Sequence, residues 1–230
     1  MTESALCTAR AAALELDFIG WTSHDGPRVI EGPEDGQASI PPLLVVVRQA
    51  SDAGAEAIII ACFDDTGLSE ARAIAQCPVI GIGQASFHLA ALLSDRSAVI
   101  TTVQAAVSVI EGNIAALGFK KQISVVEAAH VGVSELSAGT AKALEKFSDV
   151  AANINKRENI KKFILGCSGA IVPKRVLCSR ARVAWSIGAL VSHHANSSSQ
   201  SFAATSRWAS LDTNPSICAC SGVVQPPLCG

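Results

Sequence analysis

Along residues 1–170, short apolar runs alternate with longer stretches of helical periodicity. The runs that predict strands are 17–23, 57–62, 78–83, 97–102, 124–129 and 162–167. Several are unbroken apolar runs, which is typical of strands buried on both faces of a parallel sheet. The stretches that predict helices are 2–14, 40–53, 68–76, 84–93, 103–117 and about 135–155. This alternation predicts a layered α/β fold with parallel sheets and right-handed crossovers.

Two of the predicted strands end in a cysteine. The segment "AIIIACFDD" reaches Cys62 and then turns acidic, and "KFILGCSGA" reaches Cys167 over a hundred residues later. Ligands bind at the carboxyl ends of the strands in open parallel sheets. Since Thr101 and Thr102 fall at another such end, we expect a site where these strand ends meet.

Composition and charge exclude several classes of protein. The 230 residues are enough for one large domain or two small lobes, and 49% hydrophobic with 17% charged residues predicts a globular chain. A net charge of −2 provides no basic field for nucleic acid or an anionic membrane surface. Apolar runs are too short to span a bilayer, and no signal stretch is recognisable at the start. We therefore expect a cytoplasmic protein with reduced thiols.

The last sixty residues have a different composition. Residues 1–170 carry 19 acidic and 13 basic residues, whereas residues 171–230 carry 1 acidic and 5 basic residues. The second segment shows no sustained period of either 2 or 3.6. It is interpreted as an atypical tail, either a disordered or loosely packed extension or a stretch translated out of its ancestral frame from near Ala170.

A lone cysteine on an apolar segment is most often a small buried side chain, and Cys7 and Cys77 fit that description. Cys62 and Cys167 differ because each is followed by residues that can begin a helix. Backbone N–H groups exposed at such a junction stabilise a thiolate. Asp64 and Asp65 would oppose thiolate formation if they pointed at the sulfur, so we expect them to cap the next helix and face away.

Three other uses of these residues have less support. Cys218 and Cys220 are one residue apart, which does not match the knuckle spacing of structural zinc sites. A nucleophilic Cys–His pair is a weak alternative. The histidines that could approach a thiol are His24, His88 and His130. The segment "GIGQAS" at 81–86 does not complete a dinucleotide-binding motif.

The stretch "GAEAIIIACFDDTGLSEARAIAQCPVIGIGQASFHLAALL" resembles the first catalytic segment of the aspartate/glutamate/hydantoin racemase superfamily, and the hydantoin and allantoin racemase branch is the most similar. The stretches at 25–35, 97–119 and 163–169 agree. The resemblance covers roughly residues 1–170. It implies two pseudo-symmetric α/β/α lobes, at 1–94 and 95–170, with the active site in the cleft between them and neither a metal nor an organic cofactor.

The resemblance also implies roles for individual residues. Cys62 and Cys167 would be the two acid/base groups of a racemase acting on a small cyclic ureide, a 5-substituted hydantoin or allantoin. The residues that would line the substrate are Phe63, Thr101, Thr102, Ser168 and Gly169. Racemisation removes a proton from one face of a carbon and returns one to the other face, which explains why two thiols are needed.

The sequence departs from the family pattern at both ends. Met1 stands about where the first helix should begin, so the first lobe is expected to lack its first strand, and past Ala170 the closing strand and final helix cannot be found. Two alternatives therefore stay open: a related decarboxylase or cis–trans isomerase of a small dicarboxylate, and an inactive truncated relic. Assembly into a homo-oligomer is also left open.

Overall fold

The computed structural model describes residues 2–171 and 184–186. The elements in chain order are α1 (Thr2–Ala12), α2 (Pro33–Asp52), β1 (Ile58–Ile60), α3 (Leu68–Ile74), β2 (Val79–Gly81), α4 (Ile82–Leu93), β3 (Ser97–Thr101), α5 (Gln104–Ala116), β4 (Ile123–Ala128), α6 (Val133–Ser137), α7 (Ala141–Glu158), β5 (Lys162–Gly166), the 3₁₀ helix η1 (Ser168–Ile171) and β6 (Ala184–Ser186). All described strand pairs are parallel. The predicted α/β fold with parallel sheets is confirmed.

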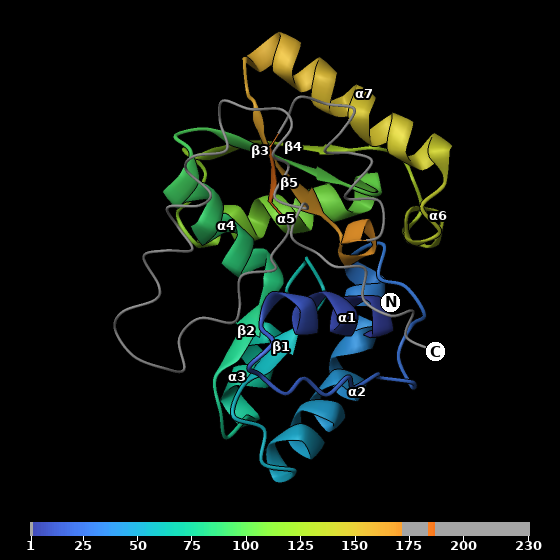
Figure 1. The fold of residues 1–230 in the computed structure, drawn as a ribbon, viewed down its shortest axis with the longest axis vertical. Helices are drawn as coiled ribbons and strands as arrows, with labels where there is room; N and C mark the ends of the chain where they lie inside the picture. The colour runs from blue at the N-terminus through green and yellow to red at the C-terminus, as the bar shows by residue number, and fades with distance from the viewer. Residues whose placement is uncertain (1, 172–183, 187–230) are drawn as a thin grey trace.

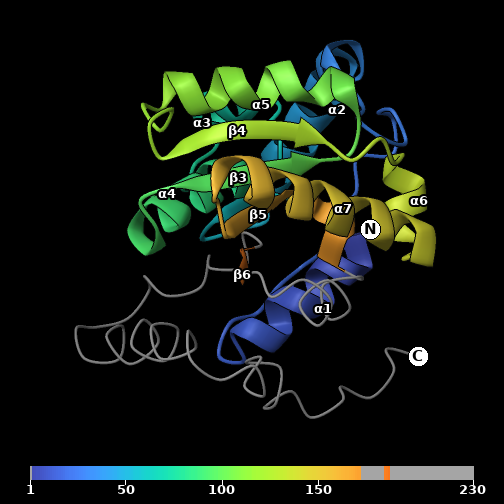
Figure 2. The same cartoon turned by 90° about the horizontal axis from the view of Figure 1, so that it is seen from above.

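The larger sheet has the strand order β4-β3-β5-β6 (Figure 1). Its strand β3 is buried along its whole length, because helices cover both faces of the sheet (Figure 2). Ala98 and Ile100 pack with side chains of α7, whereas Val99 between them packs with side chains of α4 and α5. Successive side chains of a strand point to opposite faces of the sheet, so the one apolar strand β3 contributes to two separate hydrophobic cores.

The smaller sheet consists of β1 and β2, paired with Ile58 opposite Val79 and Ile60 opposite Gly81. Helices α2 and α3 cover it. Its core is formed by Val47, Ile60, Leu68, Ala71 and Val79. The carboxyl end of β1 leads directly to Cys62, so this sheet supports one of the two candidate acid/base residues.

The prediction of a strand at 17–23 is wrong. The segment has no regular secondary structure, and Ile19 is 77% exposed. It lies along α1 instead, where Arg10 donates a hydrogen bond to the carbonyl oxygen of Phe18 and the hydroxyls of Thr2 and Thr22 are 2.8 Å apart. A β-branched and aromatic composition favours a strand only where a ladder partner is present, and the segment pairs with no described strand.

Two helical predictions are also corrected in detail. Helix α2 starts at Pro33 rather than at residue 40, since a proline that lacks an N–H suits the first turn, and Pro41 and Pro42 lie inside the helix. The helix expected at about 135–155 is divided into α6 and α7. The division occurs at Gly139, whose φ of 65° lies in the left-handed region, and Thr140 then caps α7 by accepting from the Ala143 N–H.

In the tail, which is interpreted as atypical, the structure describes β6, and its backbone pairs with β5 in parallel. The other tail residues beyond Ile171, including Cys218 and Cys220, lie outside the described residues.

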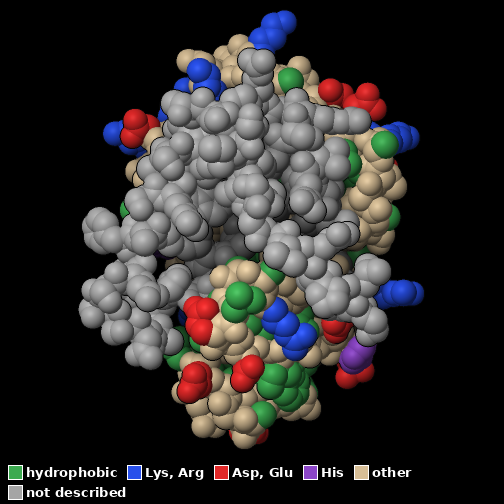
Figure 3. Space-filling model, in the orientation of Figure 1, with side chains coloured by type: hydrophobic (Ala, Val, Ile, Leu, Met, Phe, Trp, Pro, Cys, Tyr) green, Lys and Arg blue, Asp and Glu red, His purple; other side chains and the backbone are tan. Residues whose placement is uncertain are grey.

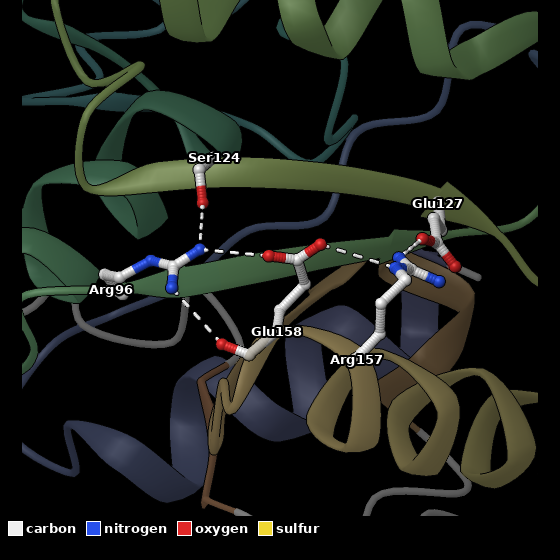
Figure 4. A network of polar contacts seen from close by, with 5 residues as sticks. All are labelled: Arg96, Ser124, Glu127, Arg157 and Glu158. Atoms are coloured by element: carbon white, nitrogen blue, oxygen red, sulfur yellow. Dashed lines mark hydrogen bonds and ion pairs between the residues drawn. The ribbon is translucent and has the colours of Figure 1, made fainter.

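A polar network on the surface joins α7 to the larger sheet (Figure 4). Arg96 donates to the carboxylate of Glu158 at 3.3 Å and to Ser124 at 3.3 Å, while Arg157 pairs with Glu127 and Glu158. These side chains are partly exposed, so the pairs contribute little to the free energy of unfolding.

On the face that Figure 3 shows, the described residues carry charges of both signs, with no extended patch of one sign. None of the helices in the described part of the chain has the length and apolar character needed to cross a membrane.

Candidate active site

A pocket of about 200 Å³ lies where the carboxyl ends of strands from both sheets meet. The residues that line it are Pro27, Arg28, Val29, Ile30, Ala61, Cys62, Phe63, Asp64, Thr101, Thr102, Ala106, Val133, Gly166, Cys167 and Ser168. Cys62 follows β1 of the smaller sheet, and Cys167 follows β5 of the larger sheet. The structure therefore brings the two cysteines to one cavity.

Cys62 is half-buried in the turn between β1 and α3. Its thiol lies 3.9 Å from the hydroxyl of Thr66, to which it donates. Burial raises the pKa of the Cys62 thiol to about 11, and the negative charge of Asp64 adds to the rise. Backbone N–H groups of Asp64 and Thr66 act in the opposite direction. The expected N–H groups are present, but Cys62 is a neutral thiol at physiological pH.

Cys167 is 8% exposed and directly precedes η1. The Gly169 N–H donates to its sulfur at 3.3 Å. Burial raises the pKa of the Cys167 thiol to about 11, and the charges of Asp64 and Glu31 raise it further, while the N–H groups of Gly169 and Ala170 lower it. Both cysteines are therefore thiols that need help to ionise.

Four of the five residues expected to line the substrate lie on the pocket. Phe63 is 4% exposed and packs edge-on against Phe87, with 5.6 Å between the ring centroids. Thr102 and Ser168 lie on the wall with Phe63, and the Thr101 hydroxyl is bound at 3.0 Å to the carbonyl oxygen of Gly166.

Gly169 is not among the residues that line the pocket, and its contact with a substrate stays a prediction. The 3₁₀ turn directs its N–H to the Cys167 sulfur, and a Cβ at this position would lie 2.6 Å from the Ser137 hydroxyl. Gly169 thus packs behind Cys167 and supports the sulfur.

Asp65 fixes the loop that carries Cys62. Its carboxylate accepts hydrogen bonds from the N–H groups of Gly83 at 3.0 Å and Gln84 at 2.6 Å, in the first turn of α4. The residue has a left-handed backbone, with φ of 51°. The prediction that Asp65 caps a helix is right in kind, but the helix is α4 and not α3, which follows next in the chain.

Asp64 does not face away, contrary to the prediction. It is 8% exposed, lines the pocket, and raises the pKa of both Cys62 and Cys167. Burial and the neighbouring Asp65 raise the pKa of the Asp64 carboxyl to about 6. Burial also raises the pKa of Asp65 to about 6 against the effect of its N–H donors. The sequence identifies Asp64 as a carboxylate beside the thiol, but the structure directs it into the pocket and not to a helix.

The segment at 27–30 forms part of the pocket wall and was not predicted as part of the site. The residues after it are anchored: Glu31 accepts from the Val133 N–H at 2.7 Å, and its own N–H donates to Asp35 at 3.0 Å. The one signal in the sequence that could have found the segment was the family resemblance at 25–35. None of His24, His88 and His130 lines the pocket, and the His88 ring packs against Phe119 instead.

Comparisons with known proteins bear on the family and the fold. The family model described as Asp/Glu/Hydantoin racemase matches residues 1–183. A hydantoin racemase from Rhizobium meliloti is 38% identical over 146 residues, which are 63% of this chain and 60% of the relative. A hydantoin racemase from Pseudomonas sp. (strain NS671) is 26% identical over 170 residues, which are 74% and 68% of the two chains.

Among solved structures, the allantoin racemase from Klebsiella pneumoniae has a TM-score of 0.77 and 28% identity, and the match covers 82% of this chain and 77% of that chain. The chain therefore has the fold of these racemases. It spans only 60% of the length of the Rhizobium relative.

Proposed function

Since the chain belongs to the Asp/Glu/hydantoin racemase family, we propose that it is a racemase that inverts the carbon stereocentre of a 5-substituted hydantoin or allantoin. The observation that carries this proposal is the convergence of Cys62 and Cys167 on one pocket from different sheets. The substrate class is proposed from the relatives, which are hydantoin racemases by sequence and an allantoin racemase by structure.

In the proposed reaction, the thiolate of one cysteine removes the proton from the ring carbon, and the thiol of the other donates its proton to the opposite face of that carbon. The first cysteine ends as a thiol and the second as a thiolate, and the roles are exchanged for the other enantiomer. Each sulfur should lie within about 3–3.5 Å of the carbon in the reactive pose. The negative charge formed meanwhile is delocalised over the adjacent carbonyl.

The energetic difficulty is to form one thiolate. With a thiol pKa of about 11, ionising one cysteine at pH 8 costs about 4 kcal/mol. The backbone N–H groups that face each sulfur reduce the cost. The hydroxyls of Thr102 and Ser168, which line the pocket, are the donors we propose for the enolate oxygen, where a well-placed donor contributes about 3–4 kcal/mol.

The test is polarimetry on an enantiopure 5-substituted hydantoin in D₂O. Loss of optical rotation together with deuterium at the ring carbon is the expected result, because the returned proton comes from a thiol in exchange with solvent. Release of CO₂ from a substituted malonate instead would support a decarboxylase. A folded protein that acts on neither compound would refute both activities.

A further inference from the structure

Asp64 is a buried carboxylate with no hydrogen-bond or ion-pair partner for its side chain among the described residues. It is 8% exposed and faces the pocket. Within residues 2–171, no hydrogen bond or ion pair reaches its side chain, whereas the adjacent Asp65 receives two backbone N–H groups. A largely buried carboxylate without a protein donor is costly unless water or a ligand in the pocket supplies the missing donor.

The position of this carboxylate is fixed by its own backbone. The side-chain amide of Asn113, in α5, donates to the Asp64 carbonyl oxygen at 2.7 Å, and the Asp64 N–H faces the Cys62 sulfur. The charge of Asp64 also acts on Cys167, which lines the same pocket. The carboxylate therefore lies near both sulfurs. A substrate whose reacting carbon lies between the sulfurs would place the atoms bonded to that carbon near Asp64.

We propose that Asp64 accepts a hydrogen bond from a substrate N–H adjacent to the reacting carbon and makes that donor a requirement of the pocket. The inference rests on the proposed function and adds to it that the pocket selects substrates which carry this N–H. In a hydantoin or allantoin ring, the carbon that is inverted is bonded to a ring nitrogen that carries a hydrogen. This N–H can donate the hydrogen bond that the Asp64 carboxylate does not receive from the described residues.

The same carboxylate selects against anions. Burial raises the pKa of Asp64 only to about 6, so the group is ionised at pH 8, and a substrate carboxylate beside it would be repelled. Arg28 is the cation among the described residues that line the pocket, and its side chain is exposed. A neutral cyclic ureide fits this distribution of charge better than a dicarboxylate does.

The test compares two uncharged rings that differ by one atom. The first is a 3-methyl-5-isobutylhydantoin, which keeps the N–H beside the reacting carbon. The second is the matching 3-methyl-5-isobutyloxazolidine-2,4-dione, in which an oxygen replaces that N–H. Calorimetric titration at pH 8 measures the Kd of each ring for the wild-type protein, for Asp64→Asn and Asp64→Ala, and for Glu70→Gln, an exposed carboxylate of α3 outside the pocket.

We expect the wild-type protein and Glu70→Gln to bind the N–H ring about 10- to 100-fold more tightly than the oxygen ring, as for a hydrogen bond to a charged acceptor. The ratio should fall in Asp64→Asn and vanish in Asp64→Ala. An unchanged ratio in Asp64→Ala, or equal binding of both rings by the wild-type protein, overturns the proposal. Racemisation of 5-isobutylhydantoin is measured separately, so a wild-type protein that binds with this ratio but does not racemise refutes only the proposed activity.

Discussion

The hydroxyl of Thr101 donates a hydrogen bond to the carbonyl oxygen of Gly166 at 3.0 Å. Thr101 ends β3, and Gly166 ends β5 immediately before Cys167. The bond fixes the strand end that presents this cysteine, and both partners line the pocket. A buried hydroxyl at the active-site end of β3 thus has a structural reason for its position.

Thr101→Val keeps the volume of the side chain and removes this hydrogen bond. We expect a loss of about 1–2 kcal/mol in the free energy of unfolding and a larger proportional loss of racemase activity, because Cys167 is less well fixed. Urea unfolding and polarimetry measure the two effects. The control is Ser148→Ala, which removes a hydroxyl-to-carbonyl bond of 2.9 Å within α7. It should cost stability with activity retained, and equal activity losses in both variants would contradict this assignment.

Replacement of either cysteine by serine should reduce racemisation by at least about 100-fold, since the weaker acid transfers a proton poorly in both directions. A variant with one of the two cysteines can still remove the proton from the face of the ring carbon that this cysteine reaches, and it can return a proton to the same face. Proton NMR in D₂O, run on each enantiomer separately, should therefore detect exchange without inversion for opposite enantiomers in the two variants. Cys77→Ser, at a half-buried cysteine outside the pocket, should retain full activity. Racemisation that survives Cys62→Ser or Cys167→Ser would refute the two-base mechanism.

The carboxylates around the thiols should affect the two cysteines differently. Asp64 raises the pKa of both, whereas Glu31 raises only that of Cys167. Each thiol is followed by the difference in thiolate absorbance between a protein that has the cysteine and the same protein with that cysteine replaced by serine, which removes the signal of the other cysteines of the chain. Asp64→Asn should lower both pKa values from about 11, and Glu31→Gln should lower that of Cys167 alone. Since burial is the largest cause, neither value should return to the ordinary 9.0. A shift of Cys62 in Glu31→Gln would contradict this arrangement.

The buried strands and the two cysteines could be predicted from the sequence because their causes are local. A strand covered on both faces, such as β3, must be apolar throughout, and the residue after such a strand must lie at the carboxyl edge of the sheet. The order and spacing of Cys62 and Cys167 also carry the family resemblance. Their placement on one pocket follows once two such strand ends are brought together.

What could not be predicted depends on partners far away in the chain. The 17–23 segment has a strand-like composition, but a strand needs a ladder, and that information is not local. The directions of Asp64 and Asp65 depend on the left-handed backbone at Asp65, which turns one carboxylate to α4 and leaves the other in the pocket.

The buried charge of Asp64 should lower the free energy of unfolding at neutral pH, compared with a protein that has an uncharged side chain at this position. Its pKa rises from an ordinary 3.8 in the unfolded chain to about 6 in the folded protein, which corresponds to about 3 kcal/mol. A raised carboxyl pKa stabilises the fold below about pH 4, and this contribution is lost as the pH rises through 6. Asp64→Asn should therefore be more stable than the wild-type protein at pH 8, by up to about 3 kcal/mol, and equally stable at pH 4. Urea unfolding at both pH values measures the difference. A variant that is less stable at pH 8 would show that Asp64 has a protein partner.

Gly83 leaves no space for a side chain at the junction of the Cys62 loop and α4. A Cβ there would lie 2.1 Å from the Phe63 carbonyl oxygen and 2.9 Å from the Asp65 carboxylate. Gly83→Ala must therefore displace the backbone next to Cys62, and we expect a loss of about 1–3 kcal/mol in stability together with a severe loss of racemase activity. Gly112, inside α5, is the matched control because a Cβ added there would meet no atom within 4 Å. Gly112→Ala should stabilise the protein by about 0.5–1 kcal/mol, as alanine does in an exposed helix interior, and leave activity unchanged. If Gly83→Ala were as active as Gly112→Ala, the contact between α4 and the Cys62 loop would not position the Cys62 thiol for the proposed reaction.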